Sequence, residues 1–263
     1  MTRQAKVAVG IPARMSSTRF PGKPLKLIQG VPMLEHVYHR CALADCVDEV
    51  FVAACDPEVE EAVKGWGGQV VMTSPEIARP ALRVAEACQS LNYHDDDIVV
   101  VVQGDEPLVH PEMIDLAVAP LLSDLDLFCV NLVGELSQDQ WTDPNEIKVV
   151  ADLQGNAIYM SRSPIPSLIH PEMTDMVFSS VGRRQVCVFP FRKRSLIEFN
   201  QLSPTPMEEA ESIEMLRAIE SGRTVRLVDS KYQTRSVDTE ADLVEVERIM
   251  ADDPVLALYT GRQ

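Results

Sequence analysis

Apolar runs and amphipathic segments alternate along the first half of the chain. The run DIVVVV at Asp97–Val102 and the run at Val7–Ile11 are nearly continuous in apolar side chains, which is typical of strands buried on both faces. The segments between the runs carry apolar side chains at helical spacing. Strands that alternate with helices predict a parallel sheet covered by helices on both faces. The strands expected here are Val7–Ile11, Glu49–Ala54, Val70–Met72 and Asp97–Val102, and the expected helices are Pro32–Ala44, Pro57–Trp66, Ala81–Leu91 and Pro111–Leu122.

The pattern is less regular in the second half. Gly155 and Asn156 predict a hairpin turn, and Ser163–Val181 contains three prolines and little periodicity. A long segment of this kind is typical of a lid, a binding loop or an oligomer contact. We therefore predict a single α/β domain over residues 1–263, with a doubly wound, mostly parallel sheet and an inserted lobe at about residues 150–195. The further elements expected are strands at Asp126–Val133, Ile147–Ala151, Val186–Pro190 and Thr224–Val228, and helices at Met207–Ile219 and Glu240–Met250.

Composition narrows the class of protein. The chain has 263 residues, 46% of them hydrophobic, and its 24 Lys+Arg against 40 Asp+Glu give a net charge of −16. This acidic balance argues against nucleic acids and anionic membranes as partners, because both are bound by basic surfaces. No apolar run approaches the ~20 residues of a membrane span, and the apolar run near the N-terminus is short for a signal peptide. Six scattered cysteines without a C-x-x-C pair indicate reduced thiols, so we expect a cytoplasmic protein.

A cationic loop follows the first strand in this acidic chain. The stretch GIPARMSSTRFPGKPL contains Arg14, Arg19 and Lys23. In a doubly wound sheet, loops at the carboxyl ends of the strands form the ligand crevice. Arginine forks bind phosphate oxygens in bidentate fashion and lysine adds a point charge, although neither the Walker pattern nor the dinucleotide pattern is present. A solvated basic turn is the alternative, but the position after the first strand favours a phosphate-binding loop.

Two acidic motifs are candidates for the same edge of the sheet. In VVVVQGDEPLV, Asp105 follows the strongest predicted strand, and a carboxylate there is suited to Mg²⁺ beside a triphosphate. A simple strand-end turn explains this motif equally well. In TRSVDTEADLVEVER, Asp238 precedes a predicted helix, where an N-terminal cap is the simpler explanation. Only its pairing with Asp105 makes Asp238 a candidate for a second metal ligand.

Together and in this order, the three motifs resemble the CMP-Kdo synthetases, the cytidylyltransferases that activate 3-deoxy-manno-octulosonate (Kdo) for cell-surface glycan synthesis. The resemblance extends from about Val7 to Met250 and includes the stretches PNEIKVVADLQGNAIYMSRSPIP and SPTPMEEAESIEMLR. It implies a Rossmann-like nucleotidyltransferase fold that binds CTP, Mg²⁺ and an anionic small-molecule acceptor. It further implies a homodimer in which the inserted lobe supplies acceptor-site and dimer contacts.

The resemblance also implies roles for individual residues. The catalytic groups would be Arg14, Arg19, Lys23 and Asp105. The nucleotide would be held by Pro12, Ala13, Arg14, Arg19, Lys23, Gln103 and Gly104, and the metal by Asp105 and Asp238. The acceptor would be held by Arg83, Arg184, Gln185, Glu208 and Glu211. For Arg184 a surface position is the alternative, and for the two glutamates a solvated helix face.

Two stretches depart from the family pattern. RPALR at Arg79–Arg83 replaces a small-residue S-G-T-[DE]-R segment, and RQVCVFPF at Arg184–Phe191 replaces R-H-L-G-I-Y-G-Y, so Gln185 stands in the place of a histidine and Cys187 in the place of a glycine. The phosphate and metal half is retained while the acceptor half is changed. The expected activity is CMP transfer to a Kdo-like 3-deoxy-2-keto sugar acid. The alternatives are another keto sugar acid, an amino-octulosonate, a small phosphonate, or a non-catalytic nucleotide-binding relative.

Overall fold

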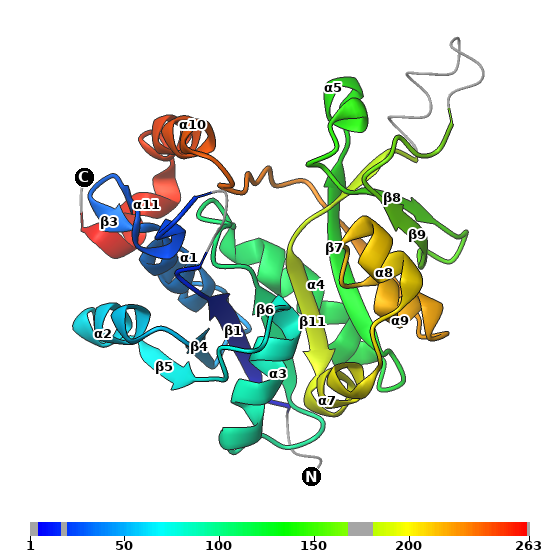
Figure 1. Cartoon of the computed structure of the whole chain (residues 1–263), viewed down its shortest axis with the longest axis horizontal. Helices are drawn as coiled ribbons and strands as arrows, with labels where there is room; N and C mark the ends of the chain where they lie inside the picture. Colours follow the sequence, from blue (N-terminus) through cyan, green and yellow to red (C-terminus); the bar gives the residue numbers. More distant parts are fainter. Residues whose placement is uncertain (1–4, 17–19, 168–180, 262–263) are drawn as a thin grey trace.

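One large sheet organises the protein (Figure 1). The computed structural model describes residues 5–16, 20–167 and 181–261. The sheet has ten strands in the order β5-β4-β1-β6-β11-β7-β10-β8-β9, and β12 pairs with β7. Its strands are β1 Val7–Ala13, β4 Glu49–Ala54, β5 Gln69–Met72, β6 Ile98–Val102, β7 Cys129–Glu135, β8 Lys148–Ala151, β9 Ala157–Ser161, β10 Arg183–Gln185, β11 Val188–Arg192 and β12 Val225–Ser230. A separate hairpin joins β2 Leu27–Ile28 to β3 Val31–Pro32.

The helices cover both faces of the sheet. One core lies between the sheet and α1, α2 and α4, and a second core lies between the opposite face and α3, α7 and α9. The strands β5, β4, β1 and β6 are parallel. Of these, β4, β1 and β6 are almost wholly apolar because both of their faces are buried, whereas β5 lies at the edge of the sheet and is partly exposed. The helices are α1 Met33–Ala42, α2 Pro57–Gly65, α3 Pro80–Ser90, α4 Pro111–Ser123, α5 Gln138–Thr142, α7 Lys193–Gln201, α8 Pro206–Glu211, α9 Leu216–Glu220, α10 Glu240–Met250 and α11 Pro254–Thr260, with a 3₁₀ turn, η1, at Lys23–Leu25.

The helix α3 packs closely on β1. A Cβ added to Gly10 would lie 2.5 Å from Val84 Cγ1 and 2.8 Å from the ring of Phe51, so only glycine fits at this position in β1. The doubly wound, mostly parallel sheet expected from the sequence is confirmed.

The second half of the sheet is antiparallel in part. β11 lies between β6 and β7 and runs antiparallel to both. The predicted lobe at about residues 150–195 therefore includes a central strand of the main sheet. The hairpin of β8 and β9 turns at Gly155, which has a φ of 80°, as the sequence predicts, and it forms one edge of the sheet. Most of the segment Ser163–Val181 lies outside the described residues.

The predicted helix Met207–Ile219 is wrong in one respect. The structure divides it into α8 and α9, because Ser212 adopts a left-handed conformation (φ 54°) that ends α8. This break turns Glu214 toward the start of α3, where its carboxylate accepts a hydrogen bond from the backbone N–H of Ala81 at 3.2 Å.

The chain returns across the carboxyl edge of the sheet after β12 and continues into α10 (Figure 1). The backbone N–H of Val237 donates to the carbonyl of Asp105 at 2.9 Å, which fixes this crossing segment to the end of β6. Val237 is also fully buried in a third apolar cluster, where it lies with Phe20 and Ile28 and with apolar residues of α10 and α11. In the described part of the chain, no helix is both long and apolar enough to cross a membrane.

Candidate active site

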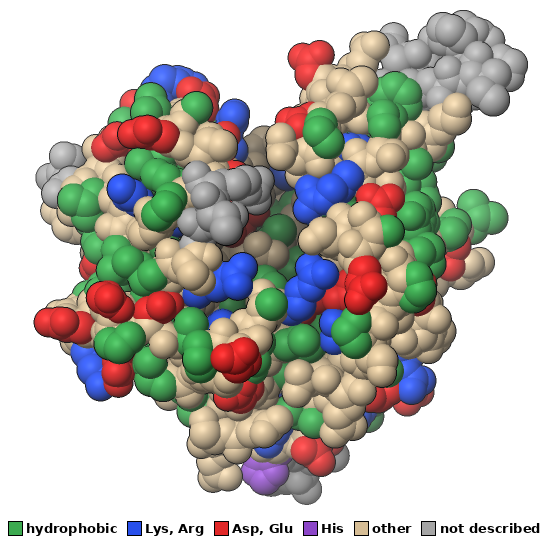
Figure 2. All heavy atoms as spheres, in the orientation of Figure 1, with side chains coloured by type: hydrophobic (Ala, Val, Ile, Leu, Met, Phe, Trp, Pro, Cys, Tyr) green, Lys and Arg blue, Asp and Glu red, His purple; other side chains and the backbone are tan. Residues whose placement is uncertain are grey.

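A pocket of about 430 Å³ opens at the carboxyl ends of β1 and β6, between the parallel and the antiparallel halves of the sheet. Figure 2 shows a hollow in this face of the molecule with lysine and arginine side chains around it. The pocket is lined by many of the residues to which the sequence motifs point: Pro12, Ala13, Arg14, Lys23, Arg79, Arg83, Gln103, Gly104, Asp105, Gln185, Cys187 and Asp238. Arg19 lies outside the described residues.

Lys23 lies between the two aspartates that the sequence predicted as metal ligands. Its Nζ is 2.6 Å from Asp105 Oδ2 and 3.2 Å from Asp238 Oδ1. Burial lowers the pKa of Lys23, but the two carboxylates more than offset this effect, so the pKa is raised above its ordinary value. Gly22 precedes η1 with a φ of 71°, and Pro24 follows within it, so this Pro-Gly turn gives the lysine its place. Segments 82 and 215 residues apart from Lys23 thus meet at one ammonium group.

The residues present fit a divalent cation. Asp105 Oδ1 is buried and has no hydrogen-bond partner among the described residues, and an orphaned carboxylate oxygen is an unusual cost unless a ligand uses it. Hard divalent cations prefer such oxygens and commonly take only one or two carboxylates together with phosphate oxygens. The described residues contain no group of three or more histidine, cysteine or acidic side chains that could form a complete metal site. A cation here would therefore need ligands from a bound phosphate.

The part of the pocket that contains the residues predicted to bind nucleotide is built from the ends of β1 and β6. Gly104 allows the segment after β6 to approach the end of β1 closely, because a Cβ at this position would lie only 3.0 Å from the carbonyl oxygen of Pro12. The backbone N–H of Gln103 donates to the carbonyl of Cys187 at 3.3 Å, which joins the end of β6 to the segment before β11. The structure thus brings together all the described residues that were predicted to bind nucleotide.

Arg83 lines the pocket but its guanidinium holds a loop. It donates to Thr73 Oγ1 at 2.6 Å and to the carbonyls of Ser74 and Ile77. Its side chain is almost fully buried. Arg83 therefore shapes the wall formed by the segment before α3, and these contacts leave little of it for a ligand.

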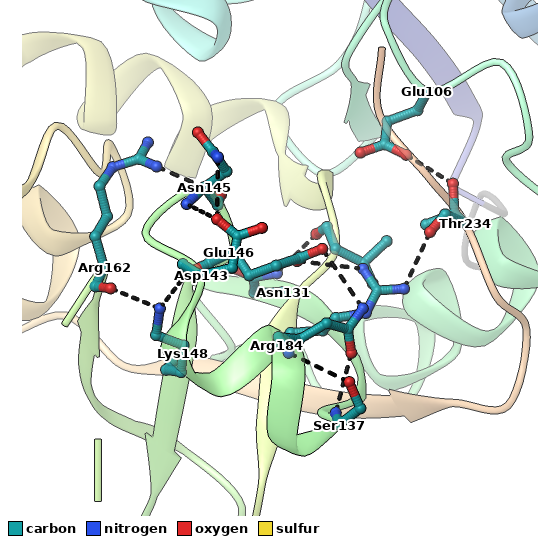
Figure 3. Close-up of polar contacts among 12 residues, drawn as sticks. Glu106, Asn131, Ser137, Asp143, Asn145, Glu146, Lys148, Arg162, Arg184 and Thr234 are labelled. Carbon is teal, nitrogen blue, oxygen red and sulfur yellow. Dashed lines mark hydrogen bonds and ion pairs between the residues drawn. The ribbon is translucent and has the colours of Figure 1, made fainter. Parts of the chain in front are cut away.

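Three residues predicted to contact the acceptor lie behind the pocket wall instead of on it. Arg184 donates to the carbonyl of Thr234 at 3.1 Å, in the segment that leads to Asp238 (Figure 3). Glu208 is completely buried in a bidentate ion pair with Arg217, at 2.7 and 2.8 Å. Glu211 accepts hydrogen bonds from Tyr159, Ser161 and the backbone of Arg162. These groups have protein partners because they connect elements around the pocket.

Two residues on the pocket wall were missed. Arg162, directly after β9, lies beside Asn145 (Figure 3). Its Nε donates to the carbonyl of Glu211 and its Nη1 to the carbonyls of Pro144 and Asn145, and no hydrogen bond of its Nη2 is found within the described residues. Glu214 has one buried oxygen without a partner, and burial is the main cause that raises its pKa to about 7. Both lie in stretches that carried the resemblance. Glu214 was overlooked because one continuous helix would place it on a solvated face with Glu208 and Glu211.

The fold and the site define a nucleotidyltransferase. The family model described as cytidylyltransferase matches residues 8–228, and the class is therefore that of CTP-dependent cytidylyltransferases. Relatives named 3-deoxy-manno-octulosonate cytidylyltransferase include one from Geobacter metallireducens, 42% identical over 248 residues (92% of this chain and 96% of the relative), and one from Myxococcus xanthus, 42% identical over 240 residues (91% and 94%). The chain belongs to the family of 3-deoxy-manno-octulosonate cytidylyltransferases, as its sequence motifs indicated.

Solved structures agree with this assignment. CMP:2-keto-3-deoxy-manno-octonic acid synthetase complexed with CTP superposes with a TM-score of 0.85 at 34% identity, and the match covers 94% of this chain and 99% of that one. A 4-diphosphocytidyl-2C-methyl-D-erythritol synthase from Anaerococcus prevotii, with a TM-score of 0.62 and 14% identity, shares the fold. Enzymes of the cytidylyltransferase class generally use a divalent metal ion. These comparisons do not favour the alternative acceptors or a non-catalytic role.

Proposed function

We propose that this protein transfers CMP from CTP to 3-deoxy-manno-octulosonate and releases pyrophosphate. The observation that carries the proposal is the contact of Lys23 with Asp105 and Asp238 at the head of the pocket. One cation beside two carboxylates is the set of charges that a triphosphate and its metal ion would use, which supports the proposal. The choice of CTP and of Kdo rests on the relatives that match more than 90% of this chain, because their names specify this nucleotide and this acceptor.

The chemistry is a displacement at phosphorus. A hydroxyl oxygen of the acceptor attacks the α-phosphorus of CTP, the bond to the pyrophosphate oxygen breaks, and the hydroxyl proton passes to water. Arg14, Arg19 and Lys23 hold the β and γ oxygens and stabilise the departing pyrophosphate, so the protein acts through positioning and charge neutralisation. Asp105 and Asp238 would hold Mg²⁺, which would reduce the repulsion between the anionic acceptor and the triphosphate. No covalent bond to the protein is required.

The acceptor occupies the antiparallel half of the pocket. The Nη2 group of Arg162 is suited to the carboxylate of the sugar acid, since arginine binds carboxylates through charge-assisted hydrogen bonds. The unpartnered oxygen of Glu214 is suited to a sugar hydroxyl. Arg184, Glu208 and Glu211 hold these walls in place through their contacts with neighbouring elements. The homodimer and the cytoplasmic location stay predictions.

A pyrophosphate-release assay tests the proposal. The protein is mixed with Mg²⁺, one nucleoside triphosphate (CTP, UTP, ATP or GTP) and one acceptor (Kdo, its 8-amino analogue, a nine-carbon keto acid or a small phosphonate). We expect rapid release only with CTP and Kdo-like acids. Release with another acceptor but not with Kdo would contradict the proposed substrate, and release with none would contradict the proposed activity.

A further inference from the structure

The orientation of one buried amide is fixed by its surroundings. Asn131 lies in β7 with no exposed surface (Figure 3). Its Nδ2 donates to the carbonyls of Leu132 at 2.7 Å and Val186 at 3.1 Å. A carbonyl oxygen accepts hydrogen bonds and cannot donate them. A half-turn of the amide would place Asn131 Oδ1 against both carbonyls and lose both bonds. Oδ1 must therefore point the other way.

The oxygen of Asn131 fixes a second amide in turn. Gln185 Nε2 lies 2.7 Å from Asn131 Oδ1 and 3.4 Å from Met160 Sδ, and neither of these atoms can donate a hydrogen bond. The reverse orientation of the Gln185 amide would bring two oxygens together. The backbone N–H of Gln185 donates to the carbonyl of Ile147 at 2.8 Å, so the residue is held at both ends.

This leaves the amide oxygen of Gln185 for a ligand. Gln185 lines the pocket with only 9% of its surface exposed, and its Oε1 has no hydrogen-bond partner among the described residues. An amide oxygen accepts hydrogen bonds only. If a bound molecule displaces water from this oxygen and leaves it without a hydrogen bond, the free energy of binding becomes less favourable. A bound molecule therefore has to supply a donor.

We propose that Gln185 is a specificity-determining residue that requires a hydrogen-bond donor, a hydroxyl or an ammonium group, at one position of the acceptor. This inference rests on the proposed function and specifies its acceptor. A carboxylate, phosphonate or keto oxygen at that position would face the Gln185 oxygen without a proton between them. The carboxylate of the acceptor is instead suited to the cationic groups that line the pocket, which include Arg79 and Arg162. The Asn131–Gln185 pair thus selects for polyhydroxy or amino-substituted acids and against small phosphonates that would fill this position.

Single-hydroxyl analogues of the acceptor test the inference in the unaltered protein. The value of kcat/KM is measured for Kdo and for analogues that each lack one hydroxyl group, at C4, C5, C7 or C8. We expect one analogue to lose about 10- to 100-fold, the effect of one unpaired buried acceptor. Replacement of that same hydroxyl by an amino group retains a donor and should restore most of the activity. If no analogue loses more than about threefold, the inference is overturned without any variant.

Two variants assign the effect to the amide pair. In Gln185→Met, the ratio of kcat/KM for Kdo to kcat/KM for the analogue that lost activity should fall to about one, while the KM for CTP stays unchanged. This ratio is called the preference. Asn131→Leu keeps Gln185 but frees its amide to turn, so the preference should fall by several-fold although the contacting side chain is still present. Gln201→Met, at an exposed glutamine at the end of α7, is the matched control and should change nothing.

The outcomes separate this inference from the function on which it rests. A preference retained in full by Gln185→Met would show that another residue reads the hydroxyl. CMP transfer to Kdo without sensitivity to any hydroxyl would overturn the inference alone. Absence of CMP transfer to Kdo in the unaltered protein would overturn the proposed function together with the inference.

Discussion

Lys23 shows how a single residue joins the parts of this site. Its ammonium group contacts carboxylates from the end of β6 and from the segment before α10, and the three groups neutralise each other in part. In the proposed function, a bound triphosphate would compete for the lysine and a metal ion would compete for the carboxylates. The cluster is therefore poised to exchange internal partners for the two components of a metal–nucleotide complex.

Replacement of this lysine should reduce turnover far more than stability. We expect Lys23→Ala to lower kcat/KM by an amount that corresponds to a loss of about 2–4 kcal/mol of transition-state stabilisation, because one preorganised charge donor is removed. Lys64→Ala removes an exposed lysine that pairs with Glu60 within α2, and serves as the matched control. Steady-state kinetics and thermal unfolding of both variants provide the check. Normal turnover in Lys23→Ala would remove the lysine from the phosphate site.

The two aspartates should behave as one unit toward metal. Asp105→Asn and Asp238→Asn should each abolish Mg²⁺-dependent turnover, and the double variant should be little worse than either single one, since groups that act together are not additive. Titration of activity with Mg²⁺ measures this. An Asp238→Asn variant with the normal Mg²⁺ dependence would reduce Asp238 to a residue that only shapes the start of α10.

Glu214 gives the site a pH dependence of defined sign. Burial raises the pKa of its carboxyl from 4.5 to about 7 in the folded protein. Between these pH values the folded state binds more protons than the unfolded state, so this group makes the free energy of unfolding fall as pH rises. The Gln side chain of Glu214→Gln cannot ionise. The free energy of unfolding of this variant, relative to that of the unaltered protein, should therefore increase by about 1–3 kcal/mol when the pH is raised from 5 to 8. Urea unfolding at both pH values tests this, and an equal difference at both would contradict it.

At the scale of the elements, a buried lysine connects the edge hairpin to the pocket. Lys148, at the start of β8, is fully buried, and its Nζ donates to the carbonyls of Asp143, Glu146 and Arg162 at 2.6–2.8 Å (Figure 3). The first two carbonyls belong to the loop that contains Asn145, and the third belongs to a pocket residue. One ammonium group thus holds two walls of the acceptor half together.

Removal of that ammonium group should loosen both walls. Lys148→Met keeps the length of the side chain but leaves three carbonyls without their donor, so we expect a loss of about 1–3 kcal/mol in the free energy of unfolding. The KM for the acceptor should rise while the KM for CTP stays near normal. Lys148→Arg retains a charge and donors and should recover part of both losses. Unchanged stability in Lys148→Met would show that water replaces the ammonium group at no cost.

The sequence predicted the local features of the elements better than their pairing. Continuous apolar runs revealed β1 and β6 and thereby the loop that carries Lys23, because strand, loop and cations are adjacent in the chain. The run at Val186–Pro190 marked β11, but periodicity carries no information about its antiparallel direction or its place between β6 and β7. The pairing of Asn131 with Gln185 depends on strands that are distant in sequence. The break at Ser212 depends on a backbone conformation that helical spacing does not reveal.

At the scale of the whole molecule, the protein is acidic overall, but basic side chains gather around the pocket. The chain has a net charge of −16, yet Arg14, Lys23, Arg79, Arg83 and Arg162 all line one pocket. The acidic exterior disfavours large polyanions, while the local cations suit a small one. Lys23 and Asp105, which we propose for the phosphate and metal site, follow strands of the parallel half, while Arg162 and Gln185 come from strands of the antiparallel half.

Identification of the product tests this account most directly. Purified protein is incubated with CTP, Mg²⁺ and Kdo, and the phosphorus resonances are followed by ³¹P NMR. The account predicts that the three CTP signals are replaced by pyrophosphate and one phosphodiester signal, and that mass spectrometry finds CMP joined to Kdo. Persistence of the CTP signals, or pyrophosphate with free CMP and no phosphodiester, would contradict transfer to this acceptor.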